Sequence, residues 1–264
     1  MSGLDREIHV YSLNVAHFLY DYSRCFWSLL ADDERERASR IKHQETQQCF
    51  VLVRSYLRSL LGRYLSCDAR SIRFALGEKG KPRLAGLEPD RGLVFNVSHT
   101  GNFGLIALAS DIALGVDVER RRAMTDMDGI AERCFSAGEL AHWRALPSDR
   151  CLQAFFDYWC FKEAFVKATG QGITLGLESC VVDMSRQPRM DLIPEIYGSP
   201  DEWHVAKIDA FTDHSAGICY RGAERKLRHF DEEVLVNMLF TDVTHGVAKL
   251  ALPVKASLAL PHQF

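Results

Sequence analysis

Asp117 and Glu119 are the first side chains in this sequence whose type and spacing suggest chemistry. They stand at positions i and i+2 of the stretch 115–119, whose alternation of residue types predicts a strand. Side chains two residues apart on a strand share a face, so the two carboxylates would lie side by side. At roughly 4 Å they would repel each other by about 4 kcal/mol at an effective dielectric of ~20. A bound Mg²⁺ would remove that repulsion, because oxygen-only ligands favour magnesium over zinc.

The same pair has a simpler interpretation as an exposed strand end. The two acids would then be solvated, with Arg120, Arg121 and Arg122 as their ion-pair partners. The strand alone leaves this alternative open, and a second charged group elsewhere in the chain argues against it.

That second group lies on an apolar helix. A start signal at Ser148 and a C′ glycine at Gly170 delimit the helix, and apolar or aromatic residues occupy almost every side of it. We therefore expect the helix to be buried. Glu163 and Lys167 share one face, one turn apart, and Lys162 precedes them. Buried charges are rare unless paired or bound to a ligand, so the helix indicates a site, with a surface ion pair as the alternative.

Two further stretches present hydrogen-bond donors. A Gly-Lys-Pro tripeptide at 80–82 presents Lys81 on an open backbone, which suits a phosphate or nucleotide. The strand predicted at 93–97 runs into Ser98 and His99, where a hydroxyl, an imidazole and exposed backbone N–H groups would meet, a donor-rich arrangement for an anion. Each signal is weak alone, and a lone histidine is more often structural. The sequence contains no G-x-S-x-G elbow, so it does not indicate a serine hydrolase.

The predicted elements that would position these groups fall into two halves. A long helix, a strand and a hairpin follow one another in the first half, and a similar order recurs in the second, which suggests a duplicated architecture with its boundary near Gly115. The acidic pair would then lie at the junction, with the buried helix facing it across a cleft. The predicted segments are strands 8–13, 71–76, 93–97, 177–183, 203–208 and 215–220, a charged helical turn at 32–42, a helix at 44–64, a hairpin of 103–109 with 112–118, and an amphipathic stretch at 232–239.

Composition narrows the class of protein. The 264 residues suffice for one large or two small domains, and 47% hydrophobic with 25% charged residues is typical of a soluble globular protein. A net charge of −3 argues against a dedicated nucleic-acid binder, and no apolar run predicts a membrane span or a secretory signal. Eight cysteines at irregular spacings, without a C-x-x-C pair, favour reduced and mostly buried thiols in a cytoplasmic protein.

Taken together, the motifs resemble the Sfp type (surfactin-synthetase-activating type) of 4′-phosphopantetheinyl transferase. The order and spacing of the motifs match over roughly residues 5 to 220. Four motifs carry the resemblance: Gly80-Lys81-Pro82, Phe95-Asn96-Val97-Ser98-His99-Thr100-Gly101, Gly115-Val116-Asp117-Val118-Glu119, and Trp159-x-x-Lys162-Glu163-x-x-x-Lys167-x-x-Gly170-x-Gly172.

The resemblance implies an α+β fold made of a pseudo-twofold pair of similar α/β lobes, each a small, mostly antiparallel sheet packed on a long helix. The expected division is an N-terminal lobe at 1–114, a C-terminal lobe at 115–223 and an extension of open role at 224–264. Coenzyme A would bind in the cleft between the lobes. The implied reaction moves 4′-phosphopantetheine from coenzyme A to a serine of a carrier protein and releases adenosine 3′,5′-bisphosphate.

The resemblance also implies which residues carry the reaction. Asp117, Glu119 and Glu163 would hold Mg²⁺ against the pyrophosphate. Glu163, Lys167 and Asp117 are the expected catalytic residues. Deprotonation of the carrier serine falls either to Glu163 or to a metal-bound water, and the sequence leaves both open.

Coenzyme A would meet a second set of residues. Lys162 and Lys167 are expected to take phosphate oxygens, with Lys167 favoured because it shares the face of Glu163. Ser98 and His99 match positions at the ribose 3′-phosphate in this family, and Lys81 matches one beside the adenine nucleotide.

One departure from the family concerns the long helix. Relatives carry a basic residue early in this helix, where the present chain has Gln47-Gln48-Cys49. Arg35 or Arg37 is the expected substitute.

Other expectations concern the partner and the rival functions. The partner would be a carrier protein of fatty-acid, polyketide or nonribosomal-peptide synthesis, in secondary metabolite biosynthesis, and the enzyme a cytoplasmic monomer without nucleic-acid or membrane partners. The run 120–122 is expected to steer an acidic carrier. The rivals are a Mg²⁺-dependent coenzyme A or nucleotide phosphohydrolase, a non-catalytic coenzyme A-binding module and a pure interaction protein.

Overall fold

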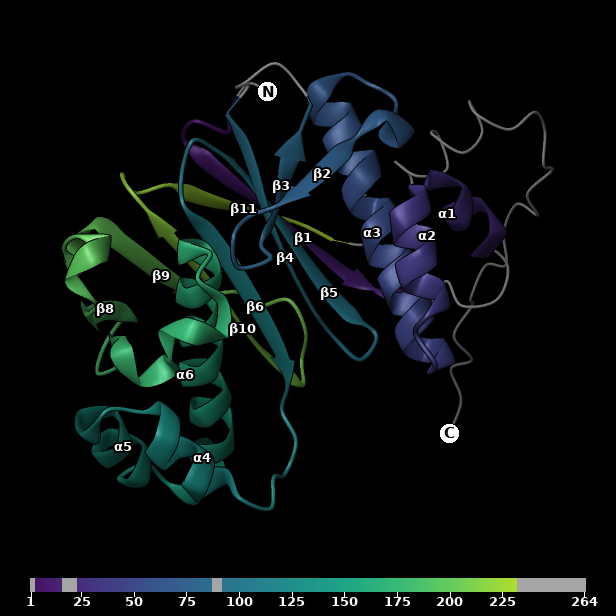
Figure 1. Ribbon diagram of the computed structural model, residues 1–264. Coiled ribbons are helices and arrows are strands. Elements are labelled where there is room, and N and C mark those ends of the chain that lie inside the picture. The colour runs from purple at the N-terminus through teal and green to yellow at the C-terminus, as the bar shows by residue number, and fades with distance from the viewer. Residues whose placement is uncertain (1–2, 16–22, 87–91, 232–264) are drawn as a thin grey trace, which may run out of the picture.

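The computed structural model of the protein describes residues 3–15, 23–86 and 92–231. Figure 1 shows two lobes, with the long helices α3 and α6 on opposite sides of the central strands. Each lobe packs a mainly antiparallel sheet against one of these two helices, which confirms the expected α+β class and the pair of lobes.

The first lobe is built on a four-stranded sheet in the order β11-β1-β5-β4. The β1–β5 and β4–β5 pairs are antiparallel, and β11 runs parallel to β1. Apolar side chains of α3 pack on this sheet in one core cluster. The elements of this lobe are β1 (Glu7–Asn14), α1 (Ser23–Leu29), α2 (Asp32–Ser39), α3 (Gln44–Leu65), β2 (Arg73–Leu76), β3 (Pro82–Ala85), β4 (Leu93–Thr100), β5 (Phe103–Ser110) and β11 (Lys226–Phe230).

The second lobe is built on the antiparallel sheet β6-β10-β9. Helix α6 covers one face of this sheet, and its aromatic side chains form a second core cluster with α4 and α5. The elements of this lobe are β6 (Leu114–Arg120), α4 (Met127–Cys134), α5 (Ala137–Arg144), α6 (Ser148–Thr169), β7 (Val181–Asp183), β8 (Arg189–Leu192), β9 (Trp203–Lys207) and β10 (His214–Arg221).

The two sheets meet along β4 and β6. Their facing sides share a third apolar cluster, which joins Val10 and Ala107 of one sheet to Val116 and Ile218 of the other. Where β4 and β6 lie side by side, side chains of β4 accept the hydrogen bonds that a neighbouring strand's backbone would otherwise accept from β6. The backbone N–H of Val116 donates to Asn96 Oδ1 at 2.8 Å, and that of Val118 donates to Ser98 Oγ at 3.3 Å. The lobes are therefore joined by a seam in which buried polar side chains satisfy strand donors.

Helix α6 approaches β6 very closely at Gly115. A Cβ atom at this position would lie 2.0 Å from the carbonyl oxygen of Ala164, so only glycine allows the contact. The helix ends at Gly170 in the left-handed conformation (φ 76°), as the sequence predicts, whereas its N-cap is Pro147 and Ser148 is the first helical residue. The close approach brings the polar face of α6 against the acidic end of β6.

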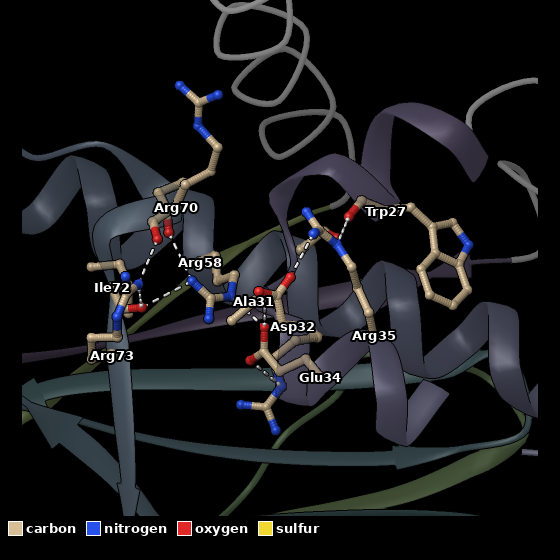
Figure 2. A network of polar contacts seen from close by, with 12 residues as sticks. Trp27, Ala31, Asp32, Glu34, Arg35, Arg58, Arg70, Ile72 and Arg73 are labelled. Atoms are coloured by element: carbon tan, nitrogen blue, oxygen red, sulfur yellow. Dashed lines mark hydrogen bonds and ion pairs between the residues drawn. The ribbon is translucent and has the colours of Figure 1, made fainter. Parts of the chain in front are cut away.

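A buried ion-pair network fixes α2 against α3, as Figure 2 shows. Arg58 Nε donates to Glu34 Oε2 at 2.6 Å, and its Nη1 donates to the carbonyls of Ala69 and Ile72. Glu34 also accepts from the backbone N–H of Ala31 at the helix N-terminus. The charged turn predicted at 32–42 is thus a helix whose Glu34 is anchored in the core.

Two features of the strands differ from the sequence prediction. Strands β5 and β6 do not form a hairpin: β5 pairs with β1 and β4, and β6 pairs with β10 in the other sheet. The chain turns at Asp111 with φ 52° and crosses between sheets, while the hairpin is β4–β5, turning at Gly101 (φ 51°). Moreover, β4 continues to Thr100, so Ser98 and His99 are strand residues with ladder partners and not a donor-rich strand end.

The segment expected beyond the lobes also has a structural role. Residues 226–230 form β11, which extends the first sheet at β1. The predicted stretch 232–239 lies outside the described residues.

The described cysteines are all free thiols, and Cys49, Cys160, Cys180 and Cys219 are buried. No helix in the described ranges has both the length and the apolarity to cross a bilayer.

Candidate active site

A polar cluster lies at the seam between the lobes, where Asp117, Ser98 and Lys167 meet. Lys167 Nζ donates to Asp117 Oδ1 at 2.6 Å and to Ser98 Oγ at 2.9 Å, and the Ser98 hydroxyl donates to the same Asp117 oxygen at 2.8 Å. Asp117 is 4% exposed. Strand β4, strand β6 and helix α6 therefore each contribute one member of a compact polar cluster around a largely desolvated charge pair.

Two further carboxylates flank this cluster. Glu119 follows Asp117 on the same face of β6 and accepts a hydrogen bond from Thr100 Oγ1 at 3.2 Å, and Glu163 lies one turn before Lys167 on α6. Burial, and then the charge of Asp117, raise the pKa of Glu119 and of Glu163 above the usual range. The charge of Asp117 thus acts on both flanking carboxylates.

Lys162, in contrast, is not brought to this cluster. Its side chain is 0% exposed and lies within the second lobe. Its ammonium contacts Glu139 at 2.8 Å and donates to the carbonyls of Leu177 and Cys180 at 3.0 and 2.6 Å. All three ammonium protons are therefore occupied. Lys162 is placed as a structural cation and cannot reach phosphate oxygens in the cleft from this position.

His99 points to the α3 side of the first lobe, among cations that sequence reasoning partly missed. Burial, and then the charges of Lys167, Arg37 and Arg54, lower the pKa of His99. The charge of Arg37, and not that of Arg35, thus acts on His99. The Arg37 guanidinium lies over the Phe50 ring at 5.1 Å. Arg35 instead donates to the carbonyl of Trp27 (Figure 2).

Arg54 is a functional candidate that the sequence analysis did not single out. Its guanidinium lies 5.0 Å from the Phe74 ring centre and 3.4 Å from Glu34 Oε1. The signal was available, because Arg54 and Arg58 are one turn apart in the mostly apolar part of this helix, after residue 48. Only Arg58 is fully buried, at 1% exposure. Arg54 is therefore the member of the pair that can reach a ligand.

Lys81 lies at the wall of a pocket of about 330 Å³ between the Gly-Lys-Pro loop, β4 and the end of α6. Its ammonium donates to the carbonyls of Leu114 and Ala168, at 2.9 and 3.1 Å. Burial lowers the pKa of Lys81 to about 8. The lysine thus ties the loop to both β6 and α6 and lines the pocket with its stem.

The acidic cluster has some features of a divalent-cation site. Asp117 Oδ2 is buried and has no hydrogen-bond partner among the described residues. All the nearby donors would be oxygens, as magnesium prefers. However, within 3–15, 23–86 and 92–231, no three His, Cys, Asp or Glu side chains are gathered closely enough to hold a metal ion. The donor set fits magnesium, but in this arrangement Lys167 neutralises Asp117.

Comparisons with known proteins address the chain as a whole. Residues 113–219 match the family model described as the 4′-phosphopantetheinyl transferase superfamily, and residues 21–111 match that of the 4′-phosphopantetheinyl transferase N-terminal region. The protein slr0495 of Synechocystis sp., whose transferase name is provisional, is 31% identical over 195 residues, which cover 74% of this chain and 78% of that protein. This chain belongs to the 4′-phosphopantetheinyl transferase superfamily.

Further relatives of this transferase carry the same name. The 4′-phosphopantetheinyl transferase Sfp of Bacillus subtilis is 28% identical, covering 74% of this chain and 83% of its own length. HetI of Nostoc sp. is 38% identical, covering 54% of this chain and 61% of its own length. The chain is thus an enzyme of the Sfp type, as the sequence motifs indicate, and transfers 4′-phosphopantetheine from coenzyme A to carrier proteins.

Proposed function

We propose that the transferase holds Mg²⁺ with Asp117, Glu119 and Glu163 at the seam between its lobes. The unpartnered Asp117 Oδ2 and the mutual repulsion of the three acids support this assignment. When bound, the ion would neutralise charge on the pyrophosphate of coenzyme A while its phosphorus is attacked.

Lys167 is proposed to bind the pyrophosphate. Its ammonium already lies in the cleft between Asp117 and Ser98, and its side chain is 29% exposed, so a ligand can reach it. An ammonium has three donors, of which Asp117 and Ser98 use two. The remaining donor can meet a phosphate oxygen without breaking the cluster, and Ser98 then acts by holding both charged groups in place.

The nucleotide is proposed to lie on the first-lobe side of the cleft. His99, Arg37 and Arg54 form a cationic surface suited to the ribose 3′-phosphate. The pocket beside Lys81 is of a suitable size and place for the adenine ring. Here Lys81 would contribute its apolar stem, since its ammonium is bound to backbone carbonyls.

The reaction proposed for this site is a displacement at phosphorus. The hydroxyl oxygen of a carrier serine forms a bond to the β-phosphorus of coenzyme A, and the bond to adenosine 3′,5′-bisphosphate breaks. Glu163 would accept the serine proton, which is one of the two routes of deprotonation that the sequence motifs imply. The leaving group takes the negative charge with it, so atoms and charge balance.

The cluster of Lys167, Asp117 and Ser98 carries this proposal, and the mass of an apo-carrier protein tests it. Incubation with enzyme, coenzyme A and Mg²⁺ should add one phosphopantetheine to the carrier. Asp117→Asn should reduce the rate at least ~100-fold, the scale on which electrostatic groups act at transition states. The same variant should lose the Mg²⁺-induced rise in melting temperature.

A control variant at an exposed acid and an analysis of the reaction products complete the test. Glu195→Gln, at an exposed position in the second lobe, should transfer at the wild-type rate. Free phosphopantetheine without a heavier carrier would indicate a phosphohydrolase instead. A near wild-type rate for Asp117→Asn would refute the assignment of the cluster.

Four further expectations remain proposals: the cellular location, the oligomeric state, the carrier that is served and the limits of the lobes. We infer a cytoplasmic monomer that serves a carrier of fatty-acid, polyketide or nonribosomal-peptide synthesis, and we keep the lobe limits 1–114 and 115–223. The seam at β6, which begins at Leu114, supports that boundary. Sedimentation of the purified protein would measure the oligomeric state, and carrier panels would identify the pathway.

A further inference from the structure

A groove of about 800 Å³ opens at the end of β6, apart from the cluster of acids. Arg120 lines it from the last position of β6 and Arg121 from just beyond that strand, Phe103 from the start of β5 and Gln153 from α6. The rest of the lining is Lys207 at the end of β9, residues 209–213 of the β9–β10 connection, and His214 at the start of β10. Successive side chains of a strand point to opposite faces, so Arg120 faces away from Glu119. His214 is the register partner of Arg120 on β10 and shares its face. The groove is therefore distinct from the proposed magnesium site.

Three rings form an aromatic cluster at this groove. The ring centre of Phe103 lies 4.6 Å from that of Phe211 and 4.2 Å from that of His214, and the last two are 5.5 Å apart. Such contacts hold the imidazole in place from two sides. The groove thus combines a rigid apolar wall with a polar group fixed within it.

The polar group, the imidazole of His214, lacks a hydrogen-bond partner among the described residues. The residue is 6% exposed, and neither Nδ1 nor Nε2 bonds to any residue in the described part of the chain. Leaving a buried donor unsatisfied costs about 1–3 kcal/mol, and a histidine always carries at least one ring N–H. Because His214 lines the groove, an acceptor that enters the groove can supply the missing bond.

The cations around the groove differ in availability. Arg121 is occupied, because its guanidinium donates to the carbonyls of Thr212 and His214 and so fastens the loop. Lys207 is shared between Asp157 and Asp209, at 3.9 and 3.7 Å. The guanidinium of Arg120, by contrast, is exposed and forms no hydrogen bond or ion pair with a described residue. Arg120 is thus the cation left to meet a ligand.

We propose that this groove is a second binding site, for a phosphate or carboxylate group carried on an apolar stem. Arg120 would pair with the anion, the His214 N–H would donate to it, and the stem would lie against Phe103 and Phe211. The three interactions come from three separate elements, so the folded lobes preorganise the site. Its existence does not depend on the roles proposed above for the catalytic acids.

Phenyl phosphate is a suitable probe, because it joins a phosphate to an aromatic body. Calorimetry should detect its binding to the full-length protein, and inorganic phosphate should bind more weakly for want of the apolar contact. Arg120→Ser should weaken phenyl phosphate about tenfold or more through loss of a charge-assisted bond. Arg186→Ser removes the same charge from an exposed turn between β7 and β8 and should leave the affinity unchanged.

Nuclear magnetic resonance of ¹⁵N-histidine-labelled protein provides a second readout at the ring itself. The His214 imidazole signals should shift on addition of phenyl phosphate, and those of His204, which already bonds to the Gly222 carbonyl, should not. His214→Phe keeps an aromatic ring in the wall and removes the donor, so it should bind the probe less tightly. An apo-carrier protein that displaces the probe would identify a protein carboxylate as the natural anion, and continued binding would indicate a free small molecule.

Equal affinities of the Arg120→Ser and Arg186→Ser proteins would overturn the proposal, because the probe would then be attracted only by general charge. Unmoved His214 signals at saturating phenyl phosphate would overturn it as well. Arg186→Ser alters no residue assigned to the transfer reaction or to the carrier, so carrier modification should proceed at the wild-type rate in that control.

Discussion

Lys167 and Asp117 neutralise each other in the structure, whereas Glu163 has no such partner at hydrogen-bond distance among the described residues. Burial and the Asp117 charge raise the pKa of Glu163, and Lys167 offsets only part of this. A carboxyl whose pKa is raised on folding contributes stability below its unfolded pKa, and this is lost as the pH rises through the folded value. Near neutral pH, Glu163 is therefore a source of instability that a cation would relieve.

The first prediction follows for Glu163→Gln in the presence of a chelator. The variant should melt at a higher temperature than the wild type at pH 7.5, and the gain should shrink towards pH 4, where Glu163 is protonated in both folded and unfolded protein. Differential scanning calorimetry at both pH values measures the two gains. Glu195→Gln should show no such dependence, and a gain independent of pH would show that Glu163 is not under charge repulsion.

A second prediction concerns His99 and the ribose 3′-phosphate. Burial, and then nearby cations, lower the pKa of His99. A bound dianion should raise this pKa and so gain a charged donor. His99→Ala should weaken binding of coenzyme A about tenfold, and binding of 3′-dephospho-coenzyme A much less. Calorimetry with both ligands checks this, with His229→Ala on β11 as the control. Equal losses for the two ligands would leave His99 a structural residue.

At the scale of elements, the long helices were the most predictable part of the fold. The predicted helix at 44–64 is α3 (Gln44–Leu65), and Gly170 ends α6 as expected. Their boundaries depend on local signals, such as caps and apolar periodicity, that a sequence shows directly. The pairing of strands was less predictable, because alternation marks a strand but does not name its neighbour. For that reason β5 and β6 were mistaken for a hairpin.

The shared face of the two strand acids could be predicted from the sequence, whereas the orientation of the two helix lysines could be predicted only in part. Asp117 and Glu119 follow from a spacing of two on a strand, and the structure places them on one face. Lys162 and Lys167 are five residues apart, which on a helix separates them by about 140°. The two lysines could not both face Asp117, and only the packing of α6 in the folded protein shows that Lys167 does. Arg54 was overlooked, although it lies one turn from Arg58, because charged residues on a helix more often form a solvated face than a binding site.

A third prediction belongs to this element. Lys162→Met leaves Glu139 buried without its cation and should destabilise the second lobe by about 3–5 kcal/mol. Urea unfolding measures the loss. Once folded, the variant should bind coenzyme A as the wild type does, whereas Lys167→Met should bind it at least about tenfold more weakly.

The Lys162–Glu139 pair also provides its own control. A Lys162→Met/Glu139→Gln double variant removes the uncompensated charge and should recover part of the lost stability. After the Glu139→Gln change, the amide oxygen at position 139 can still accept a hydrogen bond from the backbone N–H of Val182, which limits further disruption. If Lys162→Met instead keeps its stability and loses coenzyme A affinity, the original expectation of a phosphate contact is correct.

At the scale of the whole molecule, the chain crosses between the lobes twice. It leaves the first sheet at Ser110 to begin β6, and it returns from β10 to add β11 beside β1. Figure 1 shows this last described strand running back to the first lobe. Together with the Asn96 and Ser98 seam, the return strand makes the lobes interdependent, which suits a site assembled from both.

The last prediction concerns this return strand, and compares a chain ending at Arg225 with one ending at Asp231. Only the shorter chain lacks the β1–β11 ladder and the stacking of Phe230 on Tyr11, whose ring centres are 4.6 Å apart. The shorter chain should unfold at a lower urea concentration. Its free energy of unfolding should be lower by about 2 kcal/mol or more from the loss of the Phe230 ring alone. Hydrogen exchange should be faster along β1, newly an edge strand. The comparison isolates residues 226–231, since both chains lack everything beyond them. Identical urea midpoints and β1 exchange rates would show that the first lobe is complete without β11.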